Sequence, residues 1–496
     1  MERQRELFGI WEVVLILIAV SVILGALALL DDIGVFSGGY DFQRWVLVGV
    51  CGALAPVGCL VSNHSRATLK TSGWLLFVAG ALLSTFFFGT TPYPLVESLF
   101  YPIYLAAVSG FAILVQRNRS RRGWAVVQGL ALCGVLYALL TPSVYLFAVF
   151  DGITRPDGYL PWGFANIRFW SHTATWLLPL FPLALIVGSL SQVRLWRVIV
   201  VLASGIWWWL VFLSSARGTF CALLIAFVIT ALVFRGAGWR FYRLLGTQLL
   251  AGVGFWAVLS VLVPSLMSID IDMRSIGTDT SGRIPLWTEA WMMSLERFPF
   301  GMGTQAWLTH EPLTEAYREG KTLGSPHNMY LLWAAEYGWL SVLGLGLIGV
   351  HYAFRVLHFR RLIAQGEVSD SRILFACGVF MSVVAALTHA GVSGVFIVPP
   401  SMLIGLVVLG LFVAVFDDVK EVHKRNLAQS KLRAFAAFAV FLLLLGWGSK
   451  VWDYYTFMEK DRIWASENVS VGIKPRFWFH GYYPRQPDLM NPEQVD

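Results

Sequence analysis

Long apolar runs alternate with short polar segments along almost the whole chain, from about residue 8 to residue 447. A helix needs roughly 20 apolar residues to cross a bilayer, and thirteen runs approach that length. They predict an all-α polytopic membrane protein with about 12–13 transmembrane helices. The predicted spans are 9–30, 44–62, 73–90, 95–115, 123–143, 172–190, 195–214, 218–234, 244–264, 335–354, 373–391, 400–416 and 434–448.

The polar segments between the spans differ in charge from one side of the membrane to the other. With the N-terminus inside, most Lys and Arg residues fall in inner segments such as QRNRSRRG and HFRRLIAQGEVSDSR. This bias is typical of cytoplasmic loops. The pattern predicts a membrane domain over residues 1–448 and a C-terminal tail over 449–496, which lies outside if there are thirteen spans and inside if there are twelve. The short outer loops carry few basic residues, namely Arg44, Arg155, Arg168 and Arg217.

One outer loop is much longer than the others and spans about residues 265–338. Within it, large apolar residues recur at helical spacing, and Pro285 suits a first helical turn. The spacing predicts an amphipathic helix that lies along the membrane surface, with its tryptophans at headgroup depth. The FPFGMG segment that follows predicts a tight glycine turn. The apolar stripe consists of Ile284, Trp287, Trp291, Leu295 and Phe298.

Composition supports the membrane interpretation and argues against a nucleic-acid partner. The chain is 57% hydrophobic and 14% charged, with a net charge of +7. Anchoring of the inner loops to anionic lipid headgroups explains this charge, so no nucleic-acid partner is expected. The five cysteines lie in or beside apolar spans without metal-ligand spacing, which indicates small buried side chains.

Three outer arginines are candidates for binding an anion. Arg217, in SSARGTF, stands between two apolar runs, where a charge is costly unless it faces a wet cavity or a partner. The alternative is a hairpin turn whose arginine reaches up to lipid phosphates. Arg283, in SGRIPLW, opens the surface helix, and Arg168, in GFANIRFW, stands at the outer mouth of the sixth span. The alternative for both residues is that they are ordinary solvated arginines on the protein surface.

His327, in GSPHNMY, is the candidate for proton transfer. Imidazole is the side chain best suited to general-base catalysis near neutral pH, although a histidine at this place is also typical of a helix cap. Asn328 and Glu336 follow it, either to orient the histidine or to cap the helix, with the cap favoured. The spans contain almost no Asp or Glu, which argues against an ion-coupled transporter.

In order along the chain, five short motifs resemble one superfamily: SARG, GRIPLW, PFGMG, HNMY and EYG. Over about residues 166–338 the chain resembles the O-antigen ligase superfamily of bacterial inner-membrane enzymes. That group includes lipopolysaccharide O-antigen ligases, O-antigen polymerases and pilin O-oligosaccharyltransferases. The resemblance implies a glycosyltransferase that needs no metal and no cofactor and whose active site faces the periplasm. The long outer loop would then be periplasmic, and the membrane domain would be catalytic.

The resemblance also implies the substrates and the roles of the site residues. The donor would be a glycan on undecaprenyl pyrophosphate. The acceptor would be a sugar of the lipid A core, a growing glycan end or a pilin Ser or Thr hydroxyl, with the lipid A core favoured. Arg217 and Arg283 would hold the pyrophosphate, Arg168 would be a third phosphate or sugar contact, and His327 would be the general base.

Two other functions are compatible with parts of the sequence. A metal-dependent glycosyltransferase that uses a lipid-phosphate sugar would need acidic pairs on the outer side, for which Asp31, Asp32, Asp270 and Asp272 are candidates. A glycan flippase would need a polar path through the membrane, and the inner halves of these spans are apolar. Neither alternative explains the arginines and the histidine together.

Overall fold

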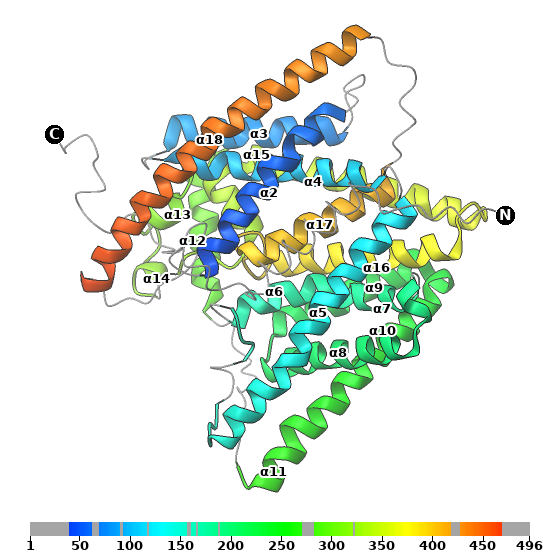
Figure 1. Cartoon of the computed structure of the whole chain (residues 1–496). Coiled ribbons are helices and arrows are strands. Elements are labelled where there is room, and N and C mark those ends of the chain that lie inside the picture. Colours follow the sequence, from blue (N-terminus) through cyan, green and yellow to red (C-terminus); the bar gives the residue numbers. More distant parts are fainter. Residues whose placement is uncertain are drawn as a thin grey trace.

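The computed structural model describes residues 39–61, 69–89, 93–116, 119–155, 160–164, 167–186, 189–269, 282–320, 323–417 and 427–468. Within these ranges every regular element is a helix, which confirms the all-α prediction (Figure 1). Eight helical segments in the described ranges are long and apolar enough to cross a membrane. The architecture is therefore that of a multi-pass membrane protein.

Most predicted spans coincide with long helices, while the first, 9–30, lies outside the described residues. The long helices are α2 (Gly39–Val61), α3 (Leu69–Phe88), α4 (Pro94–Gln116), α5 (Arg119–Phe150), α8 (Arg194–Leu213), α9 (Arg217–Phe234), α10 (Trp239–Phe255), α15 (Met329–Ala364), α16 (Asp370–Ala390), α17 (Pro399–Phe416) and α18 (Leu427–Asn468). Helix α18 continues past residue 448, where the sequence predicts that the membrane domain ends.

The sixth predicted span is interrupted rather than continuous. It consists of α6 (Ile167–Leu177), the short 3-10 helix η2 (Leu178–Leu180) and α7 (Phe181–Ala184). Pro179 and Pro182 cause the breaks, because proline lacks the N–H group that an α-helix interior requires. The outer end of this segment, which carries Arg168, is regular helix.

The apolar stretch from Arg217 to Met267 is folded back on itself. Helix α9 ends at Phe234, and Arg235 takes a φ of 50° that no α-helix accommodates. The hydroxyl of Tyr242 on α10 then donates to the carbonyl of Thr230 on α9 over 3.2 Å. Two antiparallel helices therefore occupy this stretch, as the predicted spans 218–234 and 244–264 require. A π-helical segment, η5 (Trp256–Leu262), and α11 (Val263–Met267) extend α10.

Glycines allow the closest helix pairs to approach. A Cβ added to Gly73 of α3 would lie 2.6 Å from the carbonyl oxygen of Gly344 on α15. A Cβ on Gly110 of α4 would lie 2.0 Å from the carbonyl oxygen of Leu54 on α2. Small residues at such contacts are the usual means of close helix packing in membranes, where lipid tails provide no hydrophobic drive between helices.

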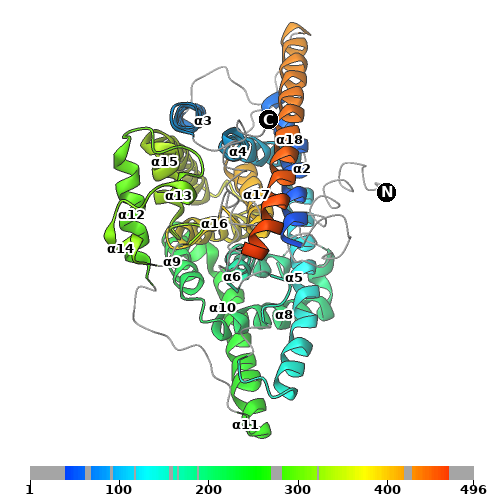
Figure 2. The same ribbon diagram turned by 90° about the vertical axis from the view of Figure 1, so that its left-hand side faces the viewer.

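The long outer loop forms a helical layer beside the first part of α15 (Figures 1 and 2). It contains α12 (Arg283–Glu296), α13 (Ala306–Thr309) and α14 (Glu315–Arg318). The predicted amphipathic helix is α12. Its predicted stripe is largely exposed, with Ile284 56% and Trp291 46% exposed, whereas Leu286, Ala290 and Met293 are buried.

The predicted glycine turn fixes this layer onto α15. The N–H groups of Met302 and Gly303 donate to the carbonyls of Ala335 and Glu336 over 2.8 and 3.0 Å. These bonds form where α15 is kinked by Gly338, whose φ is 79°. A Cβ on Gly338 would lie 2.2 Å from the carbonyl oxygen of Pro299, so a larger residue does not fit. The PFGMG and EYG motifs are thus two halves of one backbone junction.

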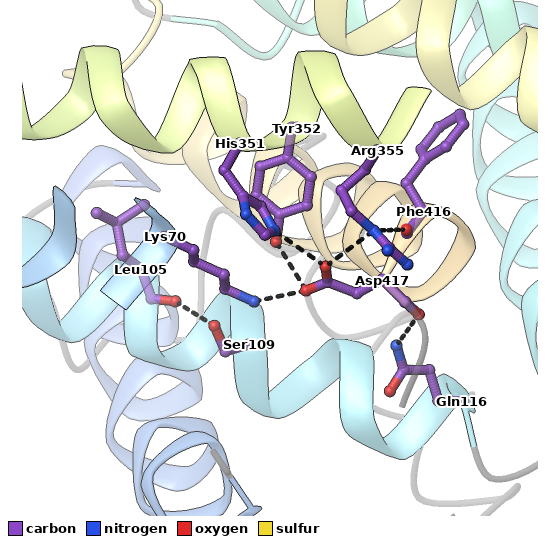
Figure 3. A network of polar contacts seen from close by, with 9 residues as sticks. All are labelled: Lys70, Leu105, Ser109, Gln116, His351, Tyr352, Arg355, Phe416 and Asp417. Atoms are coloured by element: carbon purple, nitrogen blue, oxygen red, sulfur yellow. Dashed lines mark hydrogen bonds and ion pairs between the residues drawn. The ribbon is translucent and has the colours of Figure 1, made fainter. Parts of the chain in front are cut away.

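An ionic cluster joins the start of α3, the second half of α15 and the end of α17 (Figure 3). Asp417, which follows α17, accepts from Lys70 of α3 over 2.7 Å and from Tyr352 of α15 over 3.2 Å. His351 lies 3.3 Å from the same carboxylate. His351 lies 13 residues beyond the kink at Gly338, or about 20 Å of helix, whereas His327 precedes the first turn of α15, so the cluster is remote from His327. It secures α3, α15 and α17 against one another.

Candidate functional site

Arg217 stands at the start of a helix in a tight helix–helix turn. Helix α8 ends at Leu213, Ser215 takes a left-handed φ of 48°, and α9 begins at Arg217. The residue that caps α9, Ala216, has no side-chain oxygen to accept from the first-turn N–H groups. An uncapped helix start carries a partial positive charge, so this end of α9 and the exposed Arg217 side chain both favour an anion.

Arg283 reaches the same region from the outer loop. It is the first residue of α12 and follows Gly282, which has a left-handed φ of 68°. Burial, together with the charge of Arg217, lowers the pKa of the Arg283 guanidinium. The two arginines that the sequence singles out therefore lie close enough to repel each other, and an anion between them would relieve that repulsion.

Arg168 and His327 are in direct contact. The Nη1 atom of Arg168, in the first turn of α6, lies 3.2 Å from Nε2 of His327. A guanidinium can only donate, so Nε2 is the acceptor and carries a lone pair. The proton of the neutral ring is then on Nδ1.

The environment keeps His327 in its basic form. Burial, followed by the charges of Arg168 and Arg283, lowers the pKa of His327 to about 3. The imidazole is therefore neutral at physiological pH, as a general base must be before it acts. His327 also takes a left-handed φ of 55°, which is uncommon for a residue other than glycine, and such backbone conformations cluster at functional sites.

The two residues suggested as orienting groups have other contacts. The Asn328 side chain accepts from the N–H groups of Tyr330 and Leu331 over 3.0 and 3.1 Å, so it caps α15. The Glu336 side chain is fully buried and accepts from the N–H of Trp307 over 3.1 Å. Glu336 thus connects α15 to α13 in the outer layer.

A buried polar cluster that no motif indicates lies beside the arginines. His172 of α6 and His389 of α16 are 2% and 3% exposed, with ring centroids 5.1 Å apart. His172 Nε2 lies 2.6 Å from Ser393 Oγ, and His389 Nδ1 lies 2.9 Å from Thr175 Oγ1. His172 is also within electrostatic range of Arg168.

Two observations connect this cluster to the candidate site. A Cβ on Gly218, the second residue of α9, would lie 3.0 Å from His389 Nε2, so the histidine abuts the helix start that carries Arg217. The Nδ1 atom of His172 has no hydrogen-bond partner in the described residues. A buried nitrogen of this kind requires an explanation, and binding of water or substrate provides one. The sequence signal was only that both histidines lie near the outer ends of their spans.

The structure thus brings four of the six predicted site residues together from segments far apart in the chain. Arg168, Arg217, Arg283 and His327 come from α6, α9, α12 and the residue pair before α15. The arrangement combines three cations with one neutral base, a combination suited to binding a polyanion beside a group that must lose a proton. The acidic residues considered for a metal site, Asp31, Asp32, Asp270 and Asp272, lie outside the described residues.

Comparison with known proteins agrees with the motifs. A protein-family model described as O-Antigen ligase matches residues 198–346. The matched range includes Arg217, Arg283 and His327 and supports the O-antigen ligase superfamily, so the resemblance noted from the motifs is confirmed over this range. It also supports a function of the O-antigen ligase or polymerase type. A search of curated proteins found no significant match.

Proposed function

From the similarity to O-antigen ligases, we propose that this protein transfers a glycan from undecaprenyl pyrophosphate to an acceptor hydroxyl. The reaction takes place at the periplasmic face of the bacterial inner membrane, and the acceptor is a sugar of the lipid A core. The observation that carries the proposal is a neutral His327 in contact with Arg168 and within electrostatic range of Arg283, which in turn lies near Arg217. It matches the two needs of the reaction, which are charge compensation and proton removal.

Charge compensation falls to the arginines. As the bond between the sugar C1 and the pyrophosphate oxygen breaks, the leaving group keeps the electron pair and gains negative charge. Guanidinium groups held in place before the reaction lower this barrier, and their forked donors match phosphate oxygens. Arg217 and Arg283 bind the pyrophosphate, and the first turn of α9 contributes backbone N–H donors.

Proton removal falls to His327. The acceptor oxygen forms its bond to C1 while its proton moves to the Nε2 lone pair of the neutral ring. In the ligand-free protein Arg168 occupies that lone pair. Arrival of the pyrophosphate draws the guanidinium of Arg168 toward a phosphate oxygen, which frees Nε2 for the acceptor. The base is therefore available only when the donor is bound.

The protein's own side chains supply both steps, so the proposal includes neither a metal nor a cofactor. The lipid tail of the donor lies among the membrane-exposed helices, and its glycan extends outward over the layer formed by α12, α13 and α14. The membrane lipids and the two substrates are the only partners required.

A transfer assay with purified protein tests this proposal. Undecaprenyl-pyrophosphate glycan is offered together with lipid A core, a glycan end or a pilin peptide, in separate reactions with and without EDTA. We expect EDTA-resistant transfer to lipid A core that is lost in His327→Ala. His358→Ala is the matched control, because His358 is exposed near the far end of α15.

Other outcomes would revise the proposal in defined ways. Transfer only to a glycan end or only to the pilin peptide would keep the mechanism and change the acceptor. Loss of transfer in EDTA would favour the metal-dependent alternative and direct attention to Asp31, Asp32, Asp270 and Asp272. Full activity of His327→Ala would exclude His327 as the base.

A further inference from the structure

Glu289 is a fully buried carboxylate in the middle of α12. Helix α12 belongs to the outer layer, where a glutamate would ordinarily face water. Burial of a carboxylate without partners costs several kcal/mol, and such a group either pairs or stays protonated. Its surroundings therefore decide its charge.

Four hydrogen bonds converge on this carboxylate. Its Oε1 accepts from the N–H of Leu313 over 2.6 Å and lies 2.9 Å from Nε2 of His310. Its Oε2 accepts from the N–H and the hydroxyl of Thr314 over 2.9 and 2.5 Å. The Leu313 and Thr314 donors stabilise the ionised form, since a protonated carboxyl would lose part of its accepting capacity.

The same geometry determines the protonation of His310. Its Nδ1 lies 3.0 Å from the carbonyl oxygen of Ala306, and a carbonyl can only accept, so Nδ1 carries a proton. Its Nε2 faces the Glu289 carboxylate over 2.9 Å, so both ring nitrogens lie against acceptor oxygens. An imidazolium, which donates from both nitrogens, fits this geometry, and the side chain is only 2% exposed.

Aromatic rings provide further support for a buried cation. The ring of Tyr317 is stacked on His310 with centroids 5.6 Å apart and planes 20° apart. The ring of Trp307 lies 5.7 Å from it. Aromatic faces attract cations, and the attraction increases when the cation is shielded from water.

The pair connects the two elements that carry the candidate catalytic groups. Glu289 follows Arg283 by six residues on one helix, or about 9 Å along the axis. On the other side, the backbone N–H of Trp307, three residues before His310, donates to Glu336 of α15 over 3.1 Å. A continuous path therefore runs from the helix of Arg283, through Glu289 and His310, to the helix that His327 precedes.

We propose that Glu289 and His310 form a buried carboxylate–imidazolium pair that positions Arg283 for the anionic headgroup of the donor. Both are positioning residues, because neither contacts the proposed substrate. The role of the pair in positioning Arg283 rests on the proposed pyrophosphate site, whereas the charge state of the pair does not.

The charge state is tested first and is measured in wild-type protein. The protein is labelled with ¹⁵N-histidine, and the His310 signals are assigned by their disappearance in His310→Gln. We expect both ring nitrogens of His310 to be protonated at neutral pH. One unprotonated nitrogen would overturn the ionic pair, whatever the protein's activity.

The positioning role is tested by a double-mutant cycle with inorganic pyrophosphate as the probe. Glu289→Gln should weaken pyrophosphate binding about tenfold in the wild-type background and not at all in an Arg283→Ala background. Thr314→Val, which removes one donor, should weaken binding about threefold. Glu296→Gln is the matched control, because Glu296 is exposed on the same helix. Equal weakening in both backgrounds, or none in either, would overturn the positioning role.

The two tests separate the possible failures. If wild-type protein does not bind pyrophosphate, the proposed function and the positioning role both fail, while the nitrogen spectra still decide the ionic pair. If pyrophosphate binds and Glu289→Gln changes nothing, the proposed function stands and the positioning role is wrong.

Discussion

The Nη1 atom of Arg168 lies 3.2 Å from the Nε2 atom of His327, across 159 residues of sequence. The contact joins the outer end of α6 to the residue that precedes the cap of α15. Because a guanidinium only donates, the contact identifies which ring nitrogen holds the lone pair. Because Arg168 is a cation, it also favours the neutral ring.

The contact leads to a prediction about pH dependence. The pKa of about 3 for His327 means that its basic form predominates above that pH, and protonation removes it only as pH falls further. The value of kcat/KM, which reports the free enzyme, should therefore show no acid limb between about pH 5 and pH 8. Each phosphate of the proposed donor has one ester bond, one anhydride bond and a single strongly acidic group, so neither titrates in this range. An acid limb near pH 6.5 in wild-type protein would contradict the buried, cation-flanked histidine.

The Arg168→Gln variant tests whether the charge of Arg168 influences His327. Loss of the neighbouring charge should raise the pKa of His327, so the acid limb should move to higher pH. The variant should also lose roughly 10²-fold in kcat/KM, the effect typical of one charge-stabilising donor. Arg194→Gln, at the start of α8 and exposed, is a matched control. An unchanged profile in Arg168→Gln would show that Arg168 does not influence the base.

Arg283 should contribute more to the stability of the ligand-bound protein than to that of the ligand-free protein. Its pKa is lowered by burial and by Arg217, so its charge opposes folding in the absence of an anion. Arg283→Gln should therefore unfold at the same temperature as wild type or higher. Undecaprenyl pyrophosphate at 100 times its Kd should stabilise wild type by about 2.7 kcal/mol and, with tenfold weaker binding, the variant by about 1.4 kcal/mol. Equal stabilisation of both proteins would remove Arg283 from the site.

Gly218, the second residue of α9, should not accept a side chain without a loss of transfer activity. In Gly218→Ala, the Cβ would lie 3.0 Å from Nε2 of His389, so the ring or the helix start has to move by a few tenths of an ångström. Transfer should fall about tenfold, as small displacements of positioning groups cost rate. Gly246→Ala in α10 is the control, because a Cβ there has open space around it and helix propensity favours alanine by about 1 kcal/mol. Full activity of Gly218→Ala would contradict a close fit at His389.

Asp417 should contribute to stability without contributing to transfer. Burial opposes its ionisation, but the hydrogen bond from His351 and the charge of Lys70 hold its pKa well below the usual range. A lowered folded-state pKa stabilises the protein above the unfolded-state pKa of about 3.9, and this contribution is lost as pH falls through the folded-state value. Asp417→Asn should therefore cost about 1–3 kcal/mol at pH 7, and less below about pH 4.

Thermal unfolding in detergent at several pH values measures this effect. The transfer rate, taken at a temperature where both proteins are folded, should be unchanged. A cost that does not depend on pH would mean that the carboxylate is not the source of the stabilisation.

The sequence alone determined the helical architecture and identified the polar residues that are candidates for the functional site. Apolar runs of membrane-spanning length encode helices locally, since backbone groups in lipid must bond within their own segment. The same local reasoning identified α12 from its spacing and identified Arg217, Arg283 and His327 as polar residues that need an explanation. Pro179 and Pro182, which interrupt the sixth predicted span, are a local signal of the same kind.

Only the tertiary structure decided which side chains meet. The contact of Arg168 with His327, the burial of Glu289 against His310 and the bond from Trp307 to Glu336 join segments that are 159, 21 and 29 residues apart. Hydropathy is a property of each segment, whereas these contacts depend on how helices rotate and cross when they pack. For the same reason, Glu336 cannot be recognised from its motif as a link to the outer layer. The candidate site is created by the packing of four segments, namely α6, α9, α12 and the residues before α15, rather than by any one of them.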